Sequence, residues 1–304
     1  MSSWLAQYLS ILALLLPVFV CVGIGAVWGF RKLAYPGEFI SLLVTSITTP
    51  ALVFNTLLTT ELNNALLLQI LNAALLGLLV ACLCGAALLY VLRLPVLALL
   101  PSTLFPNAGN LGLPVALFAF GETGLAVAVT IFAIFSLGQH TIGVWLLGLA
   151  NRSSPRQGKW PYGVALASLL AVALRLLDVS VPSPVLSSAQ LVGSLTVPLM
   201  LLSLGYALAT VSRSGMRTGG IVGVIRLSVG AIAGLAIVYS IDLPPEVASV
   251  VVLQMLMPVA VVTYLYTDRY TNYGQVSAGA ILVSTLLFLF LSPVLISWSH
   301  LLPS

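Results

Sequence analysis

The chain of 304 residues is 60% hydrophobic, and its charged side chains, 11 basic and 7 acidic, make up only 6% of it. A water-soluble globular chain carries about a quarter charged residues, so this composition excludes a soluble protein and indicates an integral membrane protein. In a soluble chain the formal charge of +4 would suggest a nucleic-acid partner. Here the placement of the basic residues along the chain has to be considered first.

Long apolar runs follow one another from the N-terminus to the C-terminus. Because the hydrocarbon core of a bilayer is about 30 Å thick and needs about 20 apolar residues per helix, these runs predict an all-α membrane protein with ten transmembrane helices. The predicted spans are Tyr8–Phe30, Glu38–Leu58, Ala65–Val91, Pro95–Phe120, Gly124–Leu149, Trp160–Leu177, Pro184–Thr210, Gly219–Ile241, Pro245–Tyr266 and Val276–Ser299.

The basic residues fall almost entirely in or beside one set of alternating loops, and Arg226, early in the eighth span, is assigned to that side. Arg175 is the exception, with Asp178 three residues further on. Basic loops are cytoplasmic, so we expect both termini outside and no nucleic-acid partner. The opposite loops hold five acidic residues, Glu61, Glu122, Asp178, Asp242 and Glu246.

Two short motifs recur at nearly equal distances along the chain. Pro50 and Pro198 end similar Ser/Thr-containing segments in spans two and seven, 148 positions apart, and Pro106 and Pro258 interrupt spans four and nine, 152 positions apart. Five spans per half is an odd number, so the second half crosses the membrane in the opposite sense. Residues 1–150 and 151–304 are therefore predicted to form a five-plus-five inverted repeat, an arrangement typical of transporters.

The fourth span contains the least helical stretch of any predicted span. Residues 106–114 include two prolines, two glycines and two asparagines, and proline removes a backbone donor and clashes with the preceding turn. Broken backbone at membrane depth requires protein or a water-filled cavity around it. The amides that open the following half-helix suit an anion, with Asn107 and Asn110 as neutral donors and acceptors. The alternative is a proline kink whose asparagines cap the broken turns.

The sequence resembles the auxin efflux carrier (AEC) family of permeases, which includes the plant PIN auxin exporters. The resemblance is carried by Thr103–Asn107, Gly112–Pro114 and Phe120–Glu122, together with Gln254 and Pro258 of the ninth span. The resemblance implies the fold of the bile-acid sodium symporters and sodium/proton antiporters, in which two broken helices cross at the substrate site. It further implies a homodimer with helices 1, 2, 6 and 7 as scaffold and helices 3–5 and 8–10 as a transport domain moving like an elevator. Small organic anions are the expected substrates. The short central linker, residues 151–159, favours a bacterial inner-membrane permease.

The candidate substrate-binding residues share a position at or near the two breaks: Pro106, Asn107, Gly109, Asn110, Gln139, Gln254, Pro258 and Thr263. For Gln254 and Thr263, a structural role in hydrogen bonding between helices is as good an interpretation as substrate binding. His140 and Asp268 are candidates for proton coupling. The alternatives are that His140 is a packing residue and that Asp268 is a solvated residue at the membrane boundary. No charged side chain is expected at the crossing, so an anion would rest on helix ends and neutral amides.

The leading functional prediction is a secondary carrier of small organic anions working by alternating access. The alternatives are a sodium- or proton-coupled symporter of another organic solute, or a passive channel. An enzyme is not expected, since no acidic pair or metal motif lies within the spans, and no cofactor or bound metal is predicted. The possible oxygen ligands near the second break include few carboxylates, which disfavours sodium coupling.

Overall fold

The computed structural model of the chain describes Leu9, Ala13 and residues 16–59, 62–150, 163–210 and 215–299. The predicted linker at residues 151–159 lies outside the described residues, as do Glu61 and Arg213. Within the described ranges every regular element is helical, and one isolated antiparallel bridge joins Pro106 to Val259. The all-α prediction is therefore confirmed for this part of the chain.

The first half of the chain folds into helices that are interrupted three times by a π-helical turn. Its elements are α2 (Leu16–Phe30), α3 (Gly37–Leu43), η1 (Val44–Thr48), α4 (Thr49–Thr59), α5 (Asn64–Val91), α6 (Val96–Leu104), η2 (Ala108–Gly112), α7 (Leu113–Gly138), η3 (Gln139–Gly143) and α8 (Val144–Ala150).

The second half carries its interruptions as breaks between α-helices. Its elements are α9 (Gly163–Leu176), α10 (Ser183–Gly193), α11 (Thr196–Thr210), α12 (Met216–Ser240), α13 (Pro245–Leu256), α14 (Val261–Tyr270) and α15 (Gly274–Ser299). The breaks before α11 and α14 fall at the proline motifs of spans seven and nine. The symmetry that would relate the two halves stays a prediction.

Among the described residues, five helical segments are long and apolar enough to cross a membrane, and the chain is a multi-pass membrane protein. They are Asn64–Val91, Ala108–Ala150, Ser183–Thr210, Met216–Ser240 and Gly274–Ile296. The segment of 43 residues would measure roughly 65 Å as one straight helix. Gly121, at φ 64° and ψ −156°, divides it within α7 at the predicted loop between spans four and five. The remaining predicted spans correspond to shorter apolar helices, and ten crossings stay a prediction.

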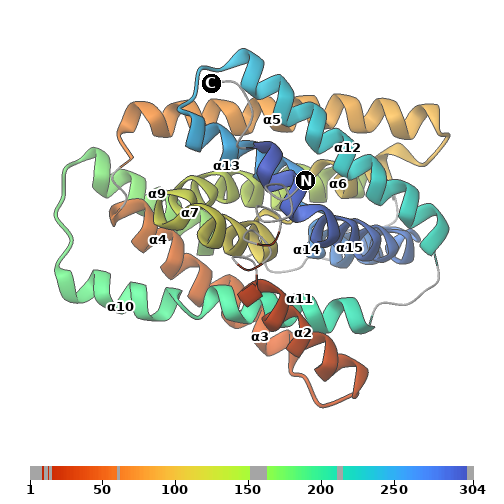
Figure 1. Cartoon of the computed structure of the whole chain (residues 1–304), viewed down its shortest axis with the longest axis horizontal. Coiled ribbons are helices and arrows are strands. Elements are labelled where there is room, and N and C mark those ends of the chain that lie inside the picture. The colour runs from red at the N-terminus through yellow and green to blue at the C-terminus, as the bar shows by residue number, and fades with distance from the viewer. Residues whose placement is uncertain are drawn as a thin grey trace.

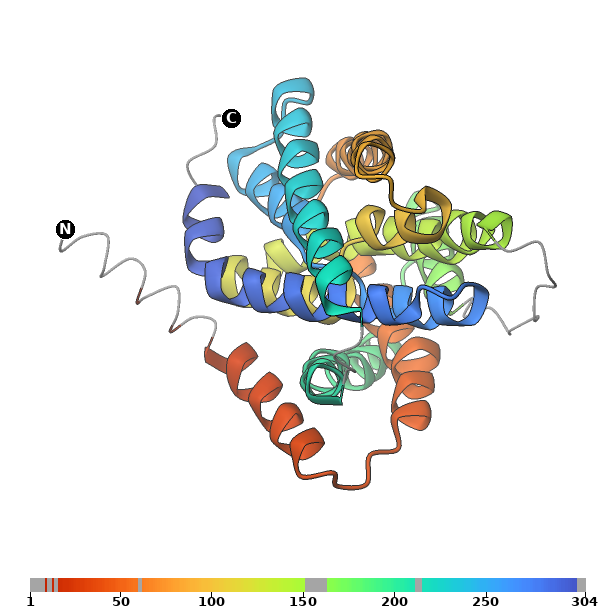
Figure 2. The same ribbon diagram turned by 90° about the vertical axis from the view of Figure 1, so that its right-hand side faces the viewer.

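The helices pack in two groups. In one, α2 packs on α11, and α4 packs on α9 and α10; in the other, α12 packs on α15, α5 and α13. In Figure 1, α10 and α11 run end to end along one edge of the molecule and α5 runs along the opposite edge. Figure 2 shows α2 and the α3–α4 segment on either side of α11. These groups contain the helices predicted for scaffold and transport domain, but the division into moving parts stays a prediction.

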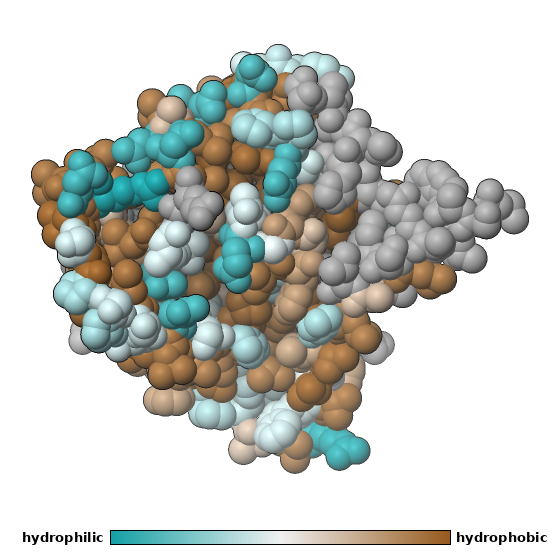
Figure 3. Space-filling model, turned by 60° about the vertical axis from the view of Figure 1, so that its left-hand side comes forward, coloured by the Kyte–Doolittle hydropathy of each residue, from teal (hydrophilic) through white to brown (hydrophobic). Residues whose placement is uncertain are grey.

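Large apolar side chains are exposed on several helices, as membrane contact requires. Leu83 of α5, Leu169 of α9 and Phe290 of α15 are among them, and apolar residues make up much of the face in Figure 3. Arg175, the basic residue outside the predicted pattern, donates to the carbonyl oxygens of Leu57 and Leu62 and to Asn64 Oδ1. It thereby links α9 to the end of α4 and to the start of α5.

The contact between α2 and α11 depends on glycines. A Cβ atom placed on Gly25 would lie 2.1 Å from the carbonyl oxygen of Leu202, and one placed on Gly205 would lie 2.0 Å from that of Val22. Glycine lets the two backbones approach to this distance, as small residues commonly do between membrane helices.

Gly25→Ala should destabilise the protein by about 1–3 kcal/mol, because the added methyl group has to displace the backbone of α11. Gly23→Ala on the same helix is the matched control, since nothing lies within 4 Å of a Cβ atom there. Thermal unfolding in detergent would measure both. Equal unfolding temperatures of the two variants would contradict the packing described for Gly25.

Candidate functional site

Two broken helices cross at the centre of the second group. The first consists of α6, an extended segment at residues 105–107, and η2 continuing into α7; the second consists of α13, residues 257–260 and α14. The extended segments are hydrogen-bonded to each other, with Asn107 N donating to Pro258 O at 2.7 Å and Ala260 N donating to Phe105 O at 3.2 Å. Each break thus supplies partners for the other.

A buried cation completes the crossing. The Arg226 side chain of α12 is 1% exposed and donates to four carbonyl oxygens at the C-terminal ends of the two half-helices. The acceptors in α6 are Thr103 at 2.8 Å and Leu104 at 3.1 Å; those after and within α13 are Met257 at 3.2 Å and Met255. The expectation that no charged side chain lies at the crossing is therefore wrong. Arg226 belongs to it rather than to a loop-side cluster.

Glycines on α12 explain how Arg226 reaches these carbonyl groups. Gly223 and Gly219 face the backbone of α15, and Gly230 and Gly234 face α13. A Cβ atom on Gly230 would lie 2.1 Å from Met255 O and 3.1 Å from the Arg226 Nη2 atom. The small residues on both sides of Arg226 bring its guanidinium between the two half-helices.

Two neutral side chains also satisfy backbone groups at the crossing. Ser284 Oγ, on α15, accepts from Val259 N at 3.1 Å. Gln254 of α13 donates through Nε2 to Gly112 O at 3.0 Å, which ties α13 to the last residue of η2. Such partners are required where no water reaches the backbone.

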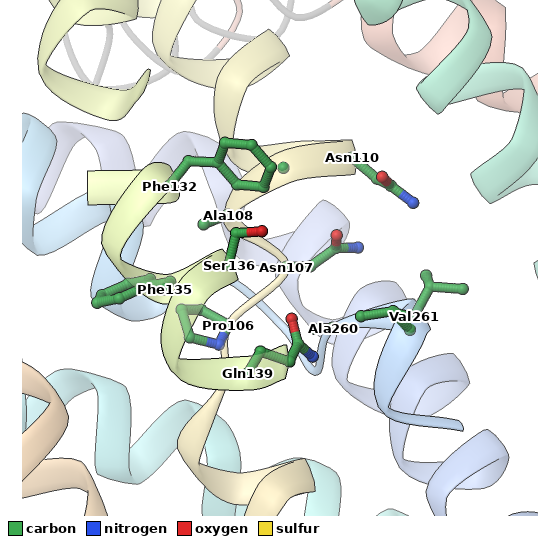
Figure 4. A pocket seen from close by; sticks show the side chains of 12 residues that line it. Pro106, Asn107, Ala108, Asn110, Phe132, Phe135, Ser136, Gln139, Ala260 and Val261 are labelled. Carbon is green, nitrogen blue, oxygen red and sulfur yellow. The ribbon is translucent and has the colours of Figure 1, made fainter. Parts of the chain in front are cut away.

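A cavity of about 60 Å³ lies beside the crossing, between η2, α7, η3 and the start of α14. In Figure 4, the side chains of Asn107, Ser136 and Gln139 point into the space in front of α14, and Asn110 lies further out. The lining residues are Pro106, Asn107, Ala108, Gly109, Asn110, Phe132, Phe135, Ser136, Gln139, Ala260, Val261 and Val262.

The two most buried amides of this cavity have donors without partners. Asn107 is 3% exposed and Gln139 is 7% exposed, and neither Asn107 Nδ2 nor Gln139 Nε2 has a hydrogen-bond partner. A buried donor left unpaired costs about 1–3 kcal/mol. These two nitrogen atoms are therefore the groups in the cavity with most to gain from a ligand that accepts hydrogen bonds.

Two helices also begin at the cavity with open amides. η2, which runs on into α7, starts after Asn107, and α14 starts after Ala260; neither N-terminus has a side-chain cap among the described residues. The first amides of a helix have no partner within it and carry partial positive charge. With the amides of Asn107 and Gln139, they make the cavity a site of hydrogen-bond donors.

The structure brings together five of the predicted substrate residues in the wall of this cavity: Pro106, Asn107, Gly109, Asn110 and Gln139. The other three predicted residues are placed elsewhere. Pro258 pairs through its carbonyl group with Asn107 N, Gln254 bonds to Gly112, and Thr263 donates to Ala260 O in the first turn of α14. A direct ligand contact for these three stays a prediction.

The two candidates for proton coupling are not among the residues that line the cavity, although His140 contacts one of them. His140 is half-buried; its Nδ1 lies 2.6 Å from Ser136 O and therefore carries the hydrogen, and its ring contacts Tyr266 edge-on at 5.8 Å. Asp268 is exposed near the end of α14, roughly 10 Å along the helix from Val261. Within the described residues, no hydrogen bond or ion pair links Asp268 to the crossing.

Sequence reasoning missed Phe132, Phe135 and Ser136, which line the cavity, and it misplaced Arg226. The first three belong to the apolar part of α7 that follows Gly121, where the sequence gives no local signal. Arg226 did carry one, because a lone arginine within an apolar span, between glycines spaced four residues apart, is a functional position by default.

Comparisons with known proteins agree with this picture. Residues 163–296 match the family described as "Membrane transport protein". The chain is also 28% identical over 188 residues to an uncharacterized transporter of Methanocaldococcus jannaschii, a match that covers 59% of this chain and 60% of that protein's length. Together these matches confirm the resemblance to the auxin efflux carrier permeases. The chain spans less than two thirds of the length of the Methanocaldococcus jannaschii protein.

Ser284→Ala should lower the free energy of unfolding by about 1–3 kcal/mol, because Val259 N at the crossing loses its acceptor. Ser292→Ala on the same helix is the matched control: Ser292 is equally buried, but it donates to Leu289 O within its own helix. Thermal unfolding of both variants measures the difference. An effect of Ser292→Ala as large as that of Ser284→Ala would contradict the role assigned to Ser284.

Proposed function

We propose that the chain is a secondary transporter of small organic anions that binds the carboxylate group of its substrate in the cavity at the crossing. The observation that carries this proposal is the pair of unpartnered amide nitrogens of Asn107 and Gln139, facing a cavity between two uncapped helix N-termini. A carboxylate offers two oxygen atoms and about four acceptor positions. It matches a site that presents donors and partial positive charge.

The absence of a cationic side chain from the cavity lining favours a transporter rather than a tight binder. Every lining residue is uncharged, so an anion is held by dipoles and by hydrogen bonds that reorganise little when it leaves. Phe132 and Phe135 supply apolar surface for the body of an organic substrate. Nitrate or chloride would not use that surface.

The size of the cavity supports alternating access. Sites for drug-sized ligands start at about 300 Å³, whereas this cavity measures about 60 Å³. It accommodates a head group or a very small acid, so a larger substrate requires that the helices around it move. We include in the proposal an elevator-type movement of helices 3–5 and 8–10 against a homodimeric scaffold, both termini outside and a bacterial inner membrane. The proposal draws these features from the family resemblance and the charge pattern.

Asn107→Ala and Gln139→Ala should each reduce carboxylate uptake about tenfold or more, because each removes a hydrogen bond to a charged group worth about 1.5–3 kcal/mol. Uptake of a panel of labelled carboxylates into proteoliposomes measures this. Asn72→Ala, at an exposed position on α5, is the control and should transport like the parent chain. Saturable uptake identifies a carrier, and a current proportional to voltage without saturation would identify a channel. Parental rates in both cavity variants would sink the site assignment.

Coupling to protons is proposed through His140. Its Nδ1 is held by the carbonyl group of Ser136, a residue of the cavity wall, so protonation of Nε2 places a positive charge beside the anion. Because only the protonated ring carries this charge, we expect faster uptake at acidic than at alkaline pH. His140→Gln should remove this dependence and His300→Gln, at the chain's other histidine, should keep it. A pH profile unchanged by His140→Gln would exclude His140 from coupling.

A further inference from the structure

Arg226 is a full positive charge with an unusual set of partners. It is 1% exposed, and its hydrogen-bond acceptors are backbone carbonyl groups at the ends of α6 and α13. Among the described residues, no carboxylate belongs to that set. An isolated buried cation is strongly unfavourable unless neighbouring groups compensate its charge, so the compensation here has to come from the helices themselves.

The helix ends at the crossing sort by sign. The carbonyl ends of two helices, α6 and α13, converge on Arg226. The amide ends of two others, η2–α7 and α14, open at the cavity. A helix end is equivalent to roughly half an elementary charge, negative at the C-terminus and positive at the N-terminus. The two carbonyl ends together carry about one negative charge, which balances the charge of Arg226. The two amide ends together carry about one positive charge, which is left without a balancing charge.

We propose that Arg226 is a positioning residue that gives the crossing a preference for a singly charged anion. By neutralising the carbonyl ends of α6 and α13, it leaves the positive amide ends of η2–α7 and α14 for the substrate to neutralise. A monoanion balances that charge; a neutral molecule leaves it unmet, and a dianion brings a second charge into a buried site without a partner. This inference rests on the proposed anion site and names the charge of its substrate.

The same four hydrogen bonds also fix the geometry of the site. Leu104 O, one of the acceptors, lies three residues before Asn107, and Met257 O lies three residues before Ala260. Holding these carbonyl groups sets where the extended segments, and hence the two open helix ends, lie. A purely structural role and the charge role therefore have to be separated by experiment.

Binding of acetate, its neutral isostere acetamide and the dianion malonate to the purified full chain separates the two roles. Ligand-dependent shifts in unfolding temperature measure each affinity. The parent should bind acetate more tightly than acetamide or malonate. Arg226→Gln should weaken acetate binding about tenfold through the uncompensated carbonyl ends, with acetamide changed less than about twofold. Arg226→Lys, which keeps the charge, should recover most of the acetate affinity.

Gly230→Ala is the structural control. A methyl group there disturbs Met255 O and the guanidinium without changing any charge, so it should lower stability and leave the ratio of acetate to acetamide affinity at the parental value. If Arg226→Gln does not fold, Arg226→Lys carries the test, and loss of its preference for acetate overturns the proposal. Equal weakening of acetate and acetamide in Arg226→Gln, unchanged acetate binding, or a parental preference for malonate also overturns it.

Failure of the proposed function gives a different result. If the parent binds none of the three probes, the anion site itself is refuted, and the charge preference falls with it. The positioning role is then read from hydrogen exchange at the amides of Asn107 and Ala260, which are bonded across the crossing. Faster exchange in Arg226→Gln than in Arg226→Lys supports that role, and equal exchange refutes it.

Discussion

Two helices are broken where they cross inside this bundle, and the backbone groups that the breaks release need partners because hydrocarbon offers none. The extended segments at residues 105–107 and 257–260 provide part of the answer by bonding to each other. Ser284 and Arg226 provide further partners from the neighbouring helices α15 and α12. Once the carbonyl ends are held in this way, the amide ends of the following half-helices are left open, and they border the cavity.

The chemistry of the cavity follows from that division. Its walls present donors from Asn107 and Gln139 and from two helix starts, while the cation that balances the carbonyl ends is bonded to the backbone at the crossing. A carrier has to release its substrate as readily as it binds it. In the proposed function, neutral donors in a fixed arrangement hold the anion without the strong ion pair that a lining lysine or arginine would form. The π-helical turns η2 and η3, from which Asn110 and Gln139 project, belong to a class of distortion frequent at functional sites.

Much of this arrangement could be predicted from the sequence, because the residue types themselves, above all proline, indicate where a helix is broken. Pro106 and Pro258 located both breaks, and the asparagine-rich segment after Pro106 located one wall of the cavity. Contacts between helices that are distant in the sequence cannot be predicted from residue types in this way. Gln254 lies within helical reach of Pro258, yet it is bonded to Gly112 of the other broken helix. Arg226 was assigned by its nearness to a predicted span boundary, whereas the depth it reaches depends on how closely α12 packs against α13 and α15.

The central claim is that a carboxylate binds beside the crossing through neutral amide donors. Solid-state NMR of the protein in lipid, with a ¹³C-carboxylate substrate and ¹⁵N-labelled asparagine, measures the distance from the carboxylate carbon to Asn107 Nδ2 directly. The account predicts a distance of about 4 Å or less, as expected for a hydrogen-bonded amide and carboxylate, and loss of this signal in Asn107→Ala. A transported carboxylate that is bound by the protein but shows no dipolar coupling to Asn107 would contradict it.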